Sequence, residues 1–169
     1  MKLNVIPPQS PWYADGLAFT CTCCGNCCTG VPGFVWMSDE EITRLAEHLG
    51  LSRDETLKKY CRKIGQRVSL KEKLSPQGNY DCIFLEETPA KSGKIPLRSR
   101  VCGIYAVRPL QCRTWPFWDG NLASKENWDE AAKRCPGMNE GRHYTQERIE
   151  ALRDAPDWPD RPPTSVGRK

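Results

Sequence analysis

Ten cysteines dominate the chemistry that this chain of 169 residues could perform. Five of them stand in the run CTCCGNCC, in which Cys21, Cys24 and Cys27 are each separated by two residues. This loop spacing lets successive thiolates converge on one metal centre. Gly25 suits such a knuckle, because a turn that folds back on a metal commonly needs a backbone position without a β-carbon. The run therefore predicts a metal site.

Three thiolates do not complete a structural metal site, so at least one further ligand must come from elsewhere in the chain. Because the side chains of neighbouring residues point apart, we expect Cys27 and Cys28 not to share one tetrahedral centre. Two nearby metal centres, or one metal cluster, would use both Cys27 and Cys28 as ligands. Four more cysteines stand in separate segments, most of them near prolines or turn-forming residues. The predicted metal ligands are Cys21, Cys24, Cys27, Cys28, Cys82, Cys102, Cys112 and Cys135.

The identity of the metal is narrowed by the softness of thiolate sulfur. Calcium and magnesium need oxygen ligands, which leaves zinc or iron as the expected cofactor. Eight thiolates suit two four-cysteine zinc sites or up to two iron–sulfur clusters, and the sequence does not choose between them. One detail points toward iron, since a Cys-x2-Cys-x2-Cys run with a distant Cys135-Pro136 is similar to the ferredoxin pattern.

Other residues that could take part in the chemistry have simpler interpretations beside the functional ones. Cys23 and Cys61 fall outside the spacing and are interpreted as buried or spectator thiols. Arg108 and Arg113 flank Cys112, where a guanidinium could offset thiolate charge or form an ordinary surface ion pair. The two histidines each stand alone, so no Cys/His or Ser/His/Asp arrangement can be assembled, and enzyme activity stays undecided.

Whether these cysteines bind metal or form disulfides depends on how reducing their cellular compartment is. Residues 1–16 contain two adjacent prolines and no apolar run of signal-peptide length, so we expect a cytoplasmic protein whose thiols stay reduced. No window reaches the roughly 18 apolar residues that a membrane span requires, so no membrane partner is expected. The net charge of +4 is small and scattered, which disfavours nucleic acid as a partner. Metal ions are the expected partners, and any protein partner is unknown.

The elements that must position the cysteines are short. Ser38 with Glu41, and Ser52 with Glu55, form capping-box patterns that open two helices. Alternating apolar residues and the turn signal at 76–79 predict a small β-hairpin over 67–85, and helical turns are expected between Cys102 and Cys112. The expected helices span 39–49, 53–62, 127–134 and 145–153.

The fold class that follows is α+β: a small, helix-dominated, loop-rich single domain organised around a cysteine-ligated metal centre. The 14 prolines and 13 glycines, with 38% hydrophobic residues, indicate that something besides apolar burial holds the fold. The expected organisation is an N-terminal extension over 1–18, a metal-binding domain over 19–154 and a disordered proline-rich tail over 155–169.

Several motifs in order, taken together, resemble the YkgJ-type cysteine-cluster family. They are CxxCGxCC at 21–28, Cys82-Ile-Phe-Leu, CGIYAVRPLQCR at 102–113, Pro116-Phe117 and Cys135-Pro136-Gly137. The resemblance implies a zinc- or iron-chelating domain whose biochemical role is largely unassigned. The cysteine motif is also similar to that of flagellin lysine methylases, which motivates a methyl-transfer alternative. The chain shows no Gly-rich strand-to-helix fingerprint for a nucleotide-like cofactor.

Three hypotheses follow. The first is a metal-binding protein in which the thiolate centre joins the N-terminal knuckle to the C-terminal half and so closes the fold. The second is an iron–sulfur redox protein, or one associated with a methyltransferase. The third is a zinc-dependent interaction module, which the weak net charge disfavours as a nucleic-acid binder.

Overall fold

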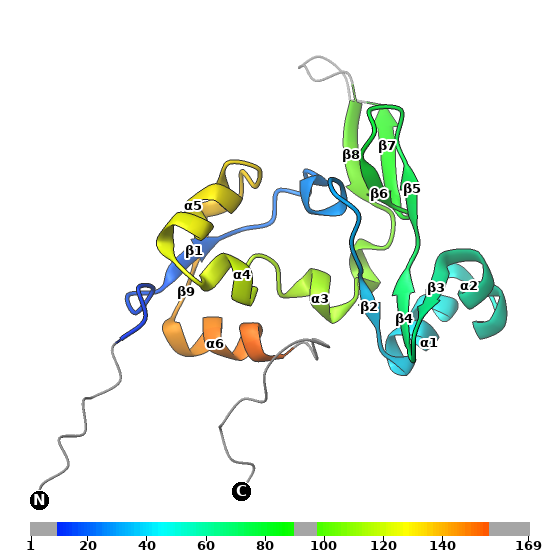
Figure 1. The fold of residues 1–169 in the computed structure, drawn as a ribbon, viewed down its shortest axis with the longest axis horizontal. Helices are drawn as coiled ribbons and strands as arrows, with labels where there is room; N and C mark the ends of the chain where they lie inside the picture. Colours follow the sequence, from blue (N-terminus) through cyan, green and yellow to red (C-terminus); the bar gives the residue numbers. More distant parts are fainter. Residues whose placement is uncertain (1–9, 90–97, 156–169) are drawn as a thin grey trace, which may run out of the picture.

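The computed structural model describes residues 10–89 and 98–155. Within these residues it mixes six α-helices with nine short strands, all paired antiparallel in two- or three-stranded sheets. Figure 1 shows two halves on either side of the cysteine-rich turn near residue 26, and each half has its own apolar core. The expected mixture of helices and strands in a small domain is therefore confirmed. Among the described residues, no helix has the length and apolar character that a membrane crossing requires.

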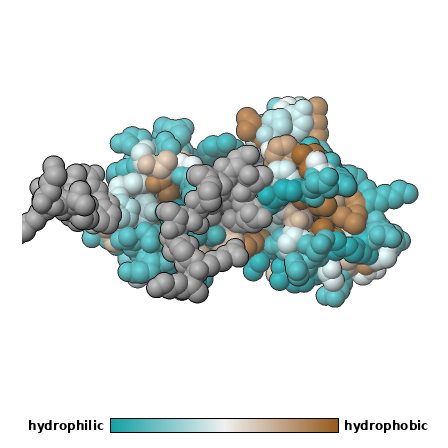
Figure 2. All heavy atoms as spheres, turned by 60° about the horizontal axis from the view of Figure 1, so that its bottom comes forward, coloured by the Kyte–Doolittle hydropathy of each residue, from teal (hydrophilic) through white to brown (hydrophobic). Residues whose placement is uncertain are grey.

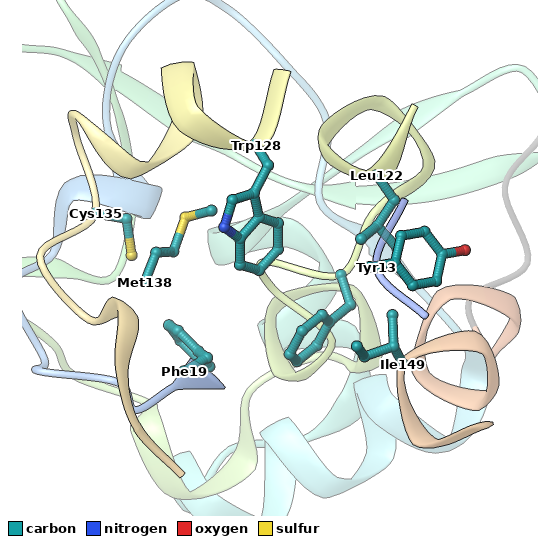
Figure 3. Close-up of a cluster of buried hydrophobic side chains, with 8 residues drawn as sticks. Tyr13, Phe19, Leu122, Trp128, Cys135, Met138 and Ile149 are labelled. Carbon is teal, nitrogen blue, oxygen red and sulfur yellow. The ribbon is translucent and has the colours of Figure 1, made fainter. Parts of the chain in front are cut away.

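The first half joins the beginning of the described chain to its end. Strand β1 (Leu17–Phe19) pairs with β9 (Met138–Tyr144), and helices α4 (Asp119–Leu122), α5 (Lys125–Ala132) and α6 (Gln146–Asp154) pack around this pair (Figure 1). Their buried side chains form one cluster, shown in Figure 3: Tyr13, Phe19, Phe117, Leu122, Trp128, Cys135, Met138 and Ile149. Because Tyr13 belongs to this core, part of the segment assigned above to an N-terminal extension is packed.

The second half is built on a three-stranded sheet with the order β2 (Trp36–Met37), β4 (Arg67–Leu70), β3 (Cys61–Ile64). Helices α1 (Asp39–Leu49) and α2 (Arg53–Tyr60) lie beside this sheet (Figure 1). The second core cluster consists of Met37, Ile42, Leu45, Cys61, Leu70, Phe84 and Ile104. In the view of Figure 2, apolar side chains gather mainly on this half, while the other half shows a mostly hydrophilic surface.

Both capping boxes are confirmed. The Ser38 hydroxyl accepts the Glu41 N–H, the Glu41 carboxylate accepts the Ser38 N–H, and Ser52 and Glu55 repeat the pattern in α2. Helix α2 ends at Tyr60 rather than near Arg62, because the chain from Cys61 onward pairs with β4.

The predicted hairpin over 67–85 is only partly right. Its turn at 76–79 is present, but it joins β5 (Glu72–Leu74) to β6 (Tyr80–Cys82). Residues 67–70 form β4 instead, which pairs with β3 through a tight turn where Gly65 has φ of 58°. A positive φ favours glycine, and this turn is what the sequence analysis missed.

The remaining elements lead into and out of the cysteine-rich region. Strand β7 (Leu85–Pro89) pairs with β8 (Arg98–Cys102), and two short 3₁₀ turns lie at Asn26–Cys28 and Tyr105–Val107. Helix α3 (Leu110–Arg113) follows Pro109 at its N-cap and ends before Pro116. The helical turns expected between Cys102 and Cys112 are thus confirmed, as are helices close to the two C-terminal ranges, now α5 and α6. Residues 156–169, most of the predicted disordered tail, lie outside the described residues.

Candidate metal centre

Gly25 shapes the cysteine-rich turn for two separate reasons. Its φ of 72° lies in the left-handed region that side chains disfavour. A β-carbon there would also lie 2.9 Å from Leu85 Cδ1 and 3.1 Å from the carbonyl oxygen of Arg100. The turn closes when the N–H of Cys28 donates to the Gly25 carbonyl at 3.0 Å. The expectation that this position needs glycine is therefore supported by both backbone angle and space.

Asn26 fastens the turn to both halves of the molecule. Its Oδ1 accepts a hydrogen bond from Arg100 Nη2 at 2.7 Å, on strand β8. Its Nδ2 donates to the Arg134 carbonyl at 2.8 Å, just after α5. Arg134 in turn donates from Nη2 to the Thr29 carbonyl at 3.2 Å. The turn that carries Cys27 and Cys28 is thereby held at the junction of the two halves.

The side chains of Cys27 and Cys28 lie side by side, and the expectation that they point apart is wrong. Their Sγ atoms are 3.8 Å apart. The reason is local: both residues belong to the 3₁₀ turn Asn26–Cys28, whereas side chains of adjacent residues diverge fully only in extended chain. The two thiols can therefore act at one centre.

Five thiols from four segments interact with one another at this junction. Cys28 hydrogen-bonds with both Cys27 and Cys102, and its pKa is raised further by the nearby Cys82. The pKa of Cys112 is raised by burial and then by the charges of Cys82, Cys27 and Cys102. These five cysteines come from the 3₁₀ turn, β6, β8 and α3. Residues up to 85 positions apart in sequence therefore share one electrostatic environment.

The pKa values of the five thiols are shifted in different directions. Hydrogen bonds with Cys28 lower the pKa of Cys27 and of Cys102 to about 7, so these two sulfurs hold negative charge near neutral pH. The proton stays on Cys28, whose pKa is raised by the same two hydrogen bonds. Burial raises the pKa of Cys82 to about 11 and also raises the pKa of Cys112. A cation at this place would replace protons and allow all five sulfurs to ionise.

Arg108 is a cation that acts on several thiols of the group. It contributes to lowering the pKa of Cys27 and Cys102. It is fixed by Tyr105, whose carbonyl accepts from Arg108 Nε at 3.1 Å and whose ring lies 3.6 Å from the guanidinium carbon. Arg113 instead faces α1, where its Nη2 lies 3.9 Å from Glu41 Oε1. Of the two flanking arginines, Arg108 therefore fits the role of offsetting thiolate charge, and Arg113 fits that of a surface ion pair.

Cys21 and Cys23 form a small group with Tyr105. Cys23 is exposed, has φ of 55°, and its backbone N–H lies 3.4 Å from Cys21 Sγ in hydrogen-bonding geometry. A hydrogen bond with Cys21 is the main cause that raises the pKa of Tyr105 to about 12. Cys24, the next residue after Cys23, is half-buried. Cys23 therefore supports its neighbour through its backbone, which the spectator interpretation did not anticipate.

The last predicted ligand lies at the edge of the first core. Cys135 is buried beside Met138 in Figure 3, and Trp115 Nε1 donates to its Sγ at 3.3 Å. A pocket of about 440 Å³ opens here and is bordered by both Cys27 and Cys135. Cys61, in contrast, is buried in the second core, as its interpretation as a buried thiol requires.

The described residues contain no group of three or more histidine, cysteine, aspartate or glutamate side chains already placed to hold a metal ion. The convergence of Cys21, Cys24 and Cys27 on one centre thus stays a prediction, as does the full set of eight ligands. The chemistry of the donors nevertheless fits zinc or iron. Soft sulfur atoms predominate, and an arginine beside them offsets their charge.

Comparison with known proteins shows to which family the chain belongs. A model of the CxxCxxCC family, described as "Putative zinc- or iron-chelating domain", matches residues 20–136. The chain belongs to this family. The matched range contains all ten cysteines, from Cys21 to Cys135. The YkgJ-type resemblance drawn from the motifs is thereby confirmed at the level of the cysteine-cluster family.

One curated relative of this CxxCxxCC protein is named "Uncharacterized protein MJ0661", from Methanocaldococcus jannaschii, and is 29% identical over 105 residues. The alignment covers 62% of the chain and 48% of the relative, so the chain spans about half the length of that protein. No solved structure matches the chain.

Proposed function

We propose that this CxxCxxCC protein binds zinc or iron through thiolates drawn from both halves of its fold, and that the metal closes the fold. The observation that carries the proposal is the placement of thiols at the junction: the Sγ atoms of Cys27 and Cys28 lie 3.8 Å apart, and both residues line one cleft with Cys82. The pKa values of Cys102 and Cys112 are shifted by thiols of this same group. Free thiols gain little from being crowded together, because ionising one makes its neighbours harder to ionise. A soft cation removes that cost and accounts for the crowding.

In this proposal each residue of the junction has a specific role. Cys27 and Cys102 are the first thiolates to offer charge, since the pKa of each is about 7. Cys28, Cys82 and Cys112 lose their protons when the metal binds. A bound zinc or iron ion supplies the positive charge that permits this ionisation. Arg108 offsets the remaining negative charge, and Gly25 and Asn26 hold the turn in place.

The proposed number of metal centres depends on how the eight predicted ligands are grouped in space. Five interact at the junction, Cys21 and Cys135 pack in or against the first core, and Cys24 belongs to neither group. We propose one centre at the junction, with the other three cysteines available for a second centre or for a larger iron–sulfur cluster. We also propose that the protein works in the cytoplasm, where these thiols stay reduced.

The deciding experiment is elemental analysis of protein purified without oxygen, with absorbance and acid-labile sulfide measured on the same sample. Zinc without a visible band means thiolate zinc sites. Iron with matching sulfide and a broad band near roughly 400 nm means a cluster. A preparation that folds and holds neither metal, even after incubation with each, contradicts the proposal.

A matched pair of variants tests the ligands themselves. Cys102→Ser should reduce bound metal, because Cys102 lies within the interacting group. Cys61→Ser should leave the metal content unchanged, because Cys61 is buried in the second core and no other cysteine contributes to the shift of its pKa. Equal metal content in both variants and the wild type would remove Cys102 from the centre.

One observation favours a second function. The 440 Å³ pocket bordered by Cys27 and Cys135 also carries the amide side chains of Asn121 and Asn127, so a small polar molecule could lie against the centre. This arrangement supports the alternative of an iron–sulfur redox or methyltransferase-associated protein over a purely structural one. Visible absorbance that changes on reduction with dithionite would support it.

A further inference from the structure

The pocket between α4, α5 and the cysteine-rich turn, which we name the α5 pocket, is lined by charges of both signs. Its volume of about 440 Å³ is ordinary for a site that binds a small molecule. Apart from the thiols, the ionisable side chains that line it are one carboxylate, Glu130, and one guanidinium, Arg134. This lining is neither acidic nor basic, which favours a ligand that itself carries both charges.

Both charges lie on one face of α5 and of the turn that continues it. This face contributes four lining residues at helical spacings of three and four: Asn127, Glu130, Ala131 and Arg134. The N–H of Arg134 donates to the Ala131 carbonyl at 3.1 Å, so the chain still turns at Arg134. Side chains one helical turn apart have β-carbons roughly 5–6 Å apart. Glu130 and Arg134 can therefore contact one small ligand above the short side chain of Ala131.

The pocket offers hydrogen-bond acceptors for a cation. Asn121 and Asn127 each donate through Nδ2 to a backbone carbonyl, at 2.7 and 2.9 Å. Because these bonds fix the two amides through their nitrogens, the amide oxygens can accept from a ligand. The ion pair between Glu130 and Lys133 is 70% exposed on both sides and therefore weak, so the carboxylate can also accept. Three acceptors suit an ammonium group, which has three donors.

Arg134 offers the donors for an anion. Its Nη2 donates to the Thr29 carbonyl at 3.2 Å and packs against Gly30, where a β-carbon would lie 3.0 Å away. A guanidinium has five N–H donors and can bind a carboxylate through two of them at once. The contact with Thr29 therefore positions the guanidinium and leaves donors for a ligand carboxylate.

The rest of the lining includes less polar groups. The indole of Trp115 lines the pocket, and its Nε1 is already bonded to Cys135 Sγ at 3.3 Å. The thiols of Cys27 and Cys135 border the same space. An aromatic ring beside sulfur atoms suits an apolar or sulfur-bearing side chain.

We propose that the α5 pocket binds a small zwitterion of the α-amino acid type. The ammonium group of the ligand contacts Glu130 and the two asparagine oxygens, and its carboxylate binds Arg134. The side chain of the ligand lies against Trp115 and the thiols that border the pocket. None of these contacts needs a bound metal, so this site goes beyond the proposed metal centre and is independent of it.

The test is a titration of the isotope-labelled full chain with L-methionine, followed by the NMR signals of its amide groups. The chain is purified without oxygen, and its metal content is measured on the same sample. We expect saturable shifts at Asn127, Glu130 and Arg134. N-acetyl-L-methionine lacks the ammonium group and L-methioninamide lacks the carboxylate, so each should bind about tenfold more weakly through the loss of charge-assisted hydrogen bonds.

A matched pair of variants locates the ammonium group. Glu130→Gln should weaken the binding of L-methionine and remove most of its preference over N-acetyl-L-methionine. The control Glu140→Gln, exposed on β9 and outside the pocket, should change neither. Equal effects of the two variants would show that Glu130 does not contact the ligand and would overturn the proposed arrangement.

Three results of the titration overturn the proposal: no saturable shift at millimolar L-methionine, shifts confined to residues outside the pocket, or equal affinities for the three ligands. The last result would mean that the pocket does not distinguish the charges. The metal measurement separates this proposal from the metal centre. A chain without metal that still binds L-methionine contradicts the metal centre alone, whereas a metal-loaded chain that does not bind it contradicts the α5 pocket alone.

Discussion

At the scale of single residues, the cysteine-rich turn depends on positions that carry no sulfur. Gly25 combines a positive φ with a close approach of β7 and β8, and no side chain meets both demands. Asn26 uses both ends of its amide to join the halves. Such residues decide whether thiols distant in sequence can meet, because a thiolate site tolerates only small displacements of its ligands.

The first prediction concerns Gly25→Ala. We expect a loss of roughly 2 kcal/mol of unfolding free energy, because the new β-carbon is strained by φ and crowds Leu85 and the Arg100 carbonyl. Urea unfolding followed by circular dichroism measures the loss. Gly33→Ala is the control, since a β-carbon there meets nothing within 4 Å. Equal effects of the two changes would contradict the account of the turn.

A second prediction uses the direction of the pKa shifts. The pKa values of Cys27 and Cys102, lowered from 9 to about 7, mean that both are thiolates above pH 7 and take up protons below it. Because metal competes with protons for the thiols, the apparent affinity for metal should fall as the pH falls, and fall more steeply below pH 7, where Cys27 and Cys102 also take up protons. Arg108→Gln raises both pKa values, so its loss of metal should begin at a higher pH.

Competition with a chromogenic chelator between pH 5.5 and 9 measures this shift. The matched control is Arg113→Gln, because that guanidinium faces Glu41 instead of the thiols. A midpoint shared by wild type and both variants would show that Arg108 does not act on the centre.

At the scale of elements, the buried Glu41 links α1 to the helix that bears Cys112. Its carboxylate caps its own helix through the Ser38 N–H, and it also accepts the N–H of Leu110 at the start of α3. Glu55 stands at the same position of the capping box in α2, but it is exposed and caps only that helix. One sequence pattern thus serves two different structural roles.

The third prediction compares these two glutamates. Glu41→Ala should lower the unfolding free energy by about 2 kcal/mol or more, because two backbone N–H groups lose a charged acceptor and one of them starts α3. Glu55→Ala should cost distinctly less. Thermal unfolding of both variants measures the difference, and an equal loss would mean that the contact from Glu41 to α3 contributes nothing.

The sequence was informative where the signal is local. Capping boxes, the turn at 76–79 and the proline-bounded α3 could be predicted because each depends on residues within a few positions. The pairing of β1 with β9 and of β3 with β4 could not, since strand partners far apart or joined by a weak turn signal leave no local pattern. For the same reason the spacing of 21–28 identified candidate ligands but did not reveal that Cys27 and Cys28 lie side by side.

At the scale of the whole molecule, two separate apolar cores lie on either side of a junction that carries the interacting thiols. The first core closes β1 onto β9, and the second closes α1 onto the three-stranded sheet. Between them lie short 3₁₀ turns, α3 and the interacting thiols. A metal ion at this place would contribute the cohesion that a small core cannot supply, as thiolate sites do in other small domains.

The last prediction follows from this division. After removal of the metal by a chelator under anaerobic conditions, backbone hydrogen exchange should accelerate most in the elements that carry the thiols, which are residues 21–28, β6, β8 and α3. Helix α1 should keep its protection longest, because Ile42 and Leu45 are buried in the second core and the helix itself carries no thiol. If exchange at the junction were unchanged by the chelator, the hydrogen bonds of Asn26 and the two cores would suffice to close the fold, and the metal would have to serve chemistry rather than structure.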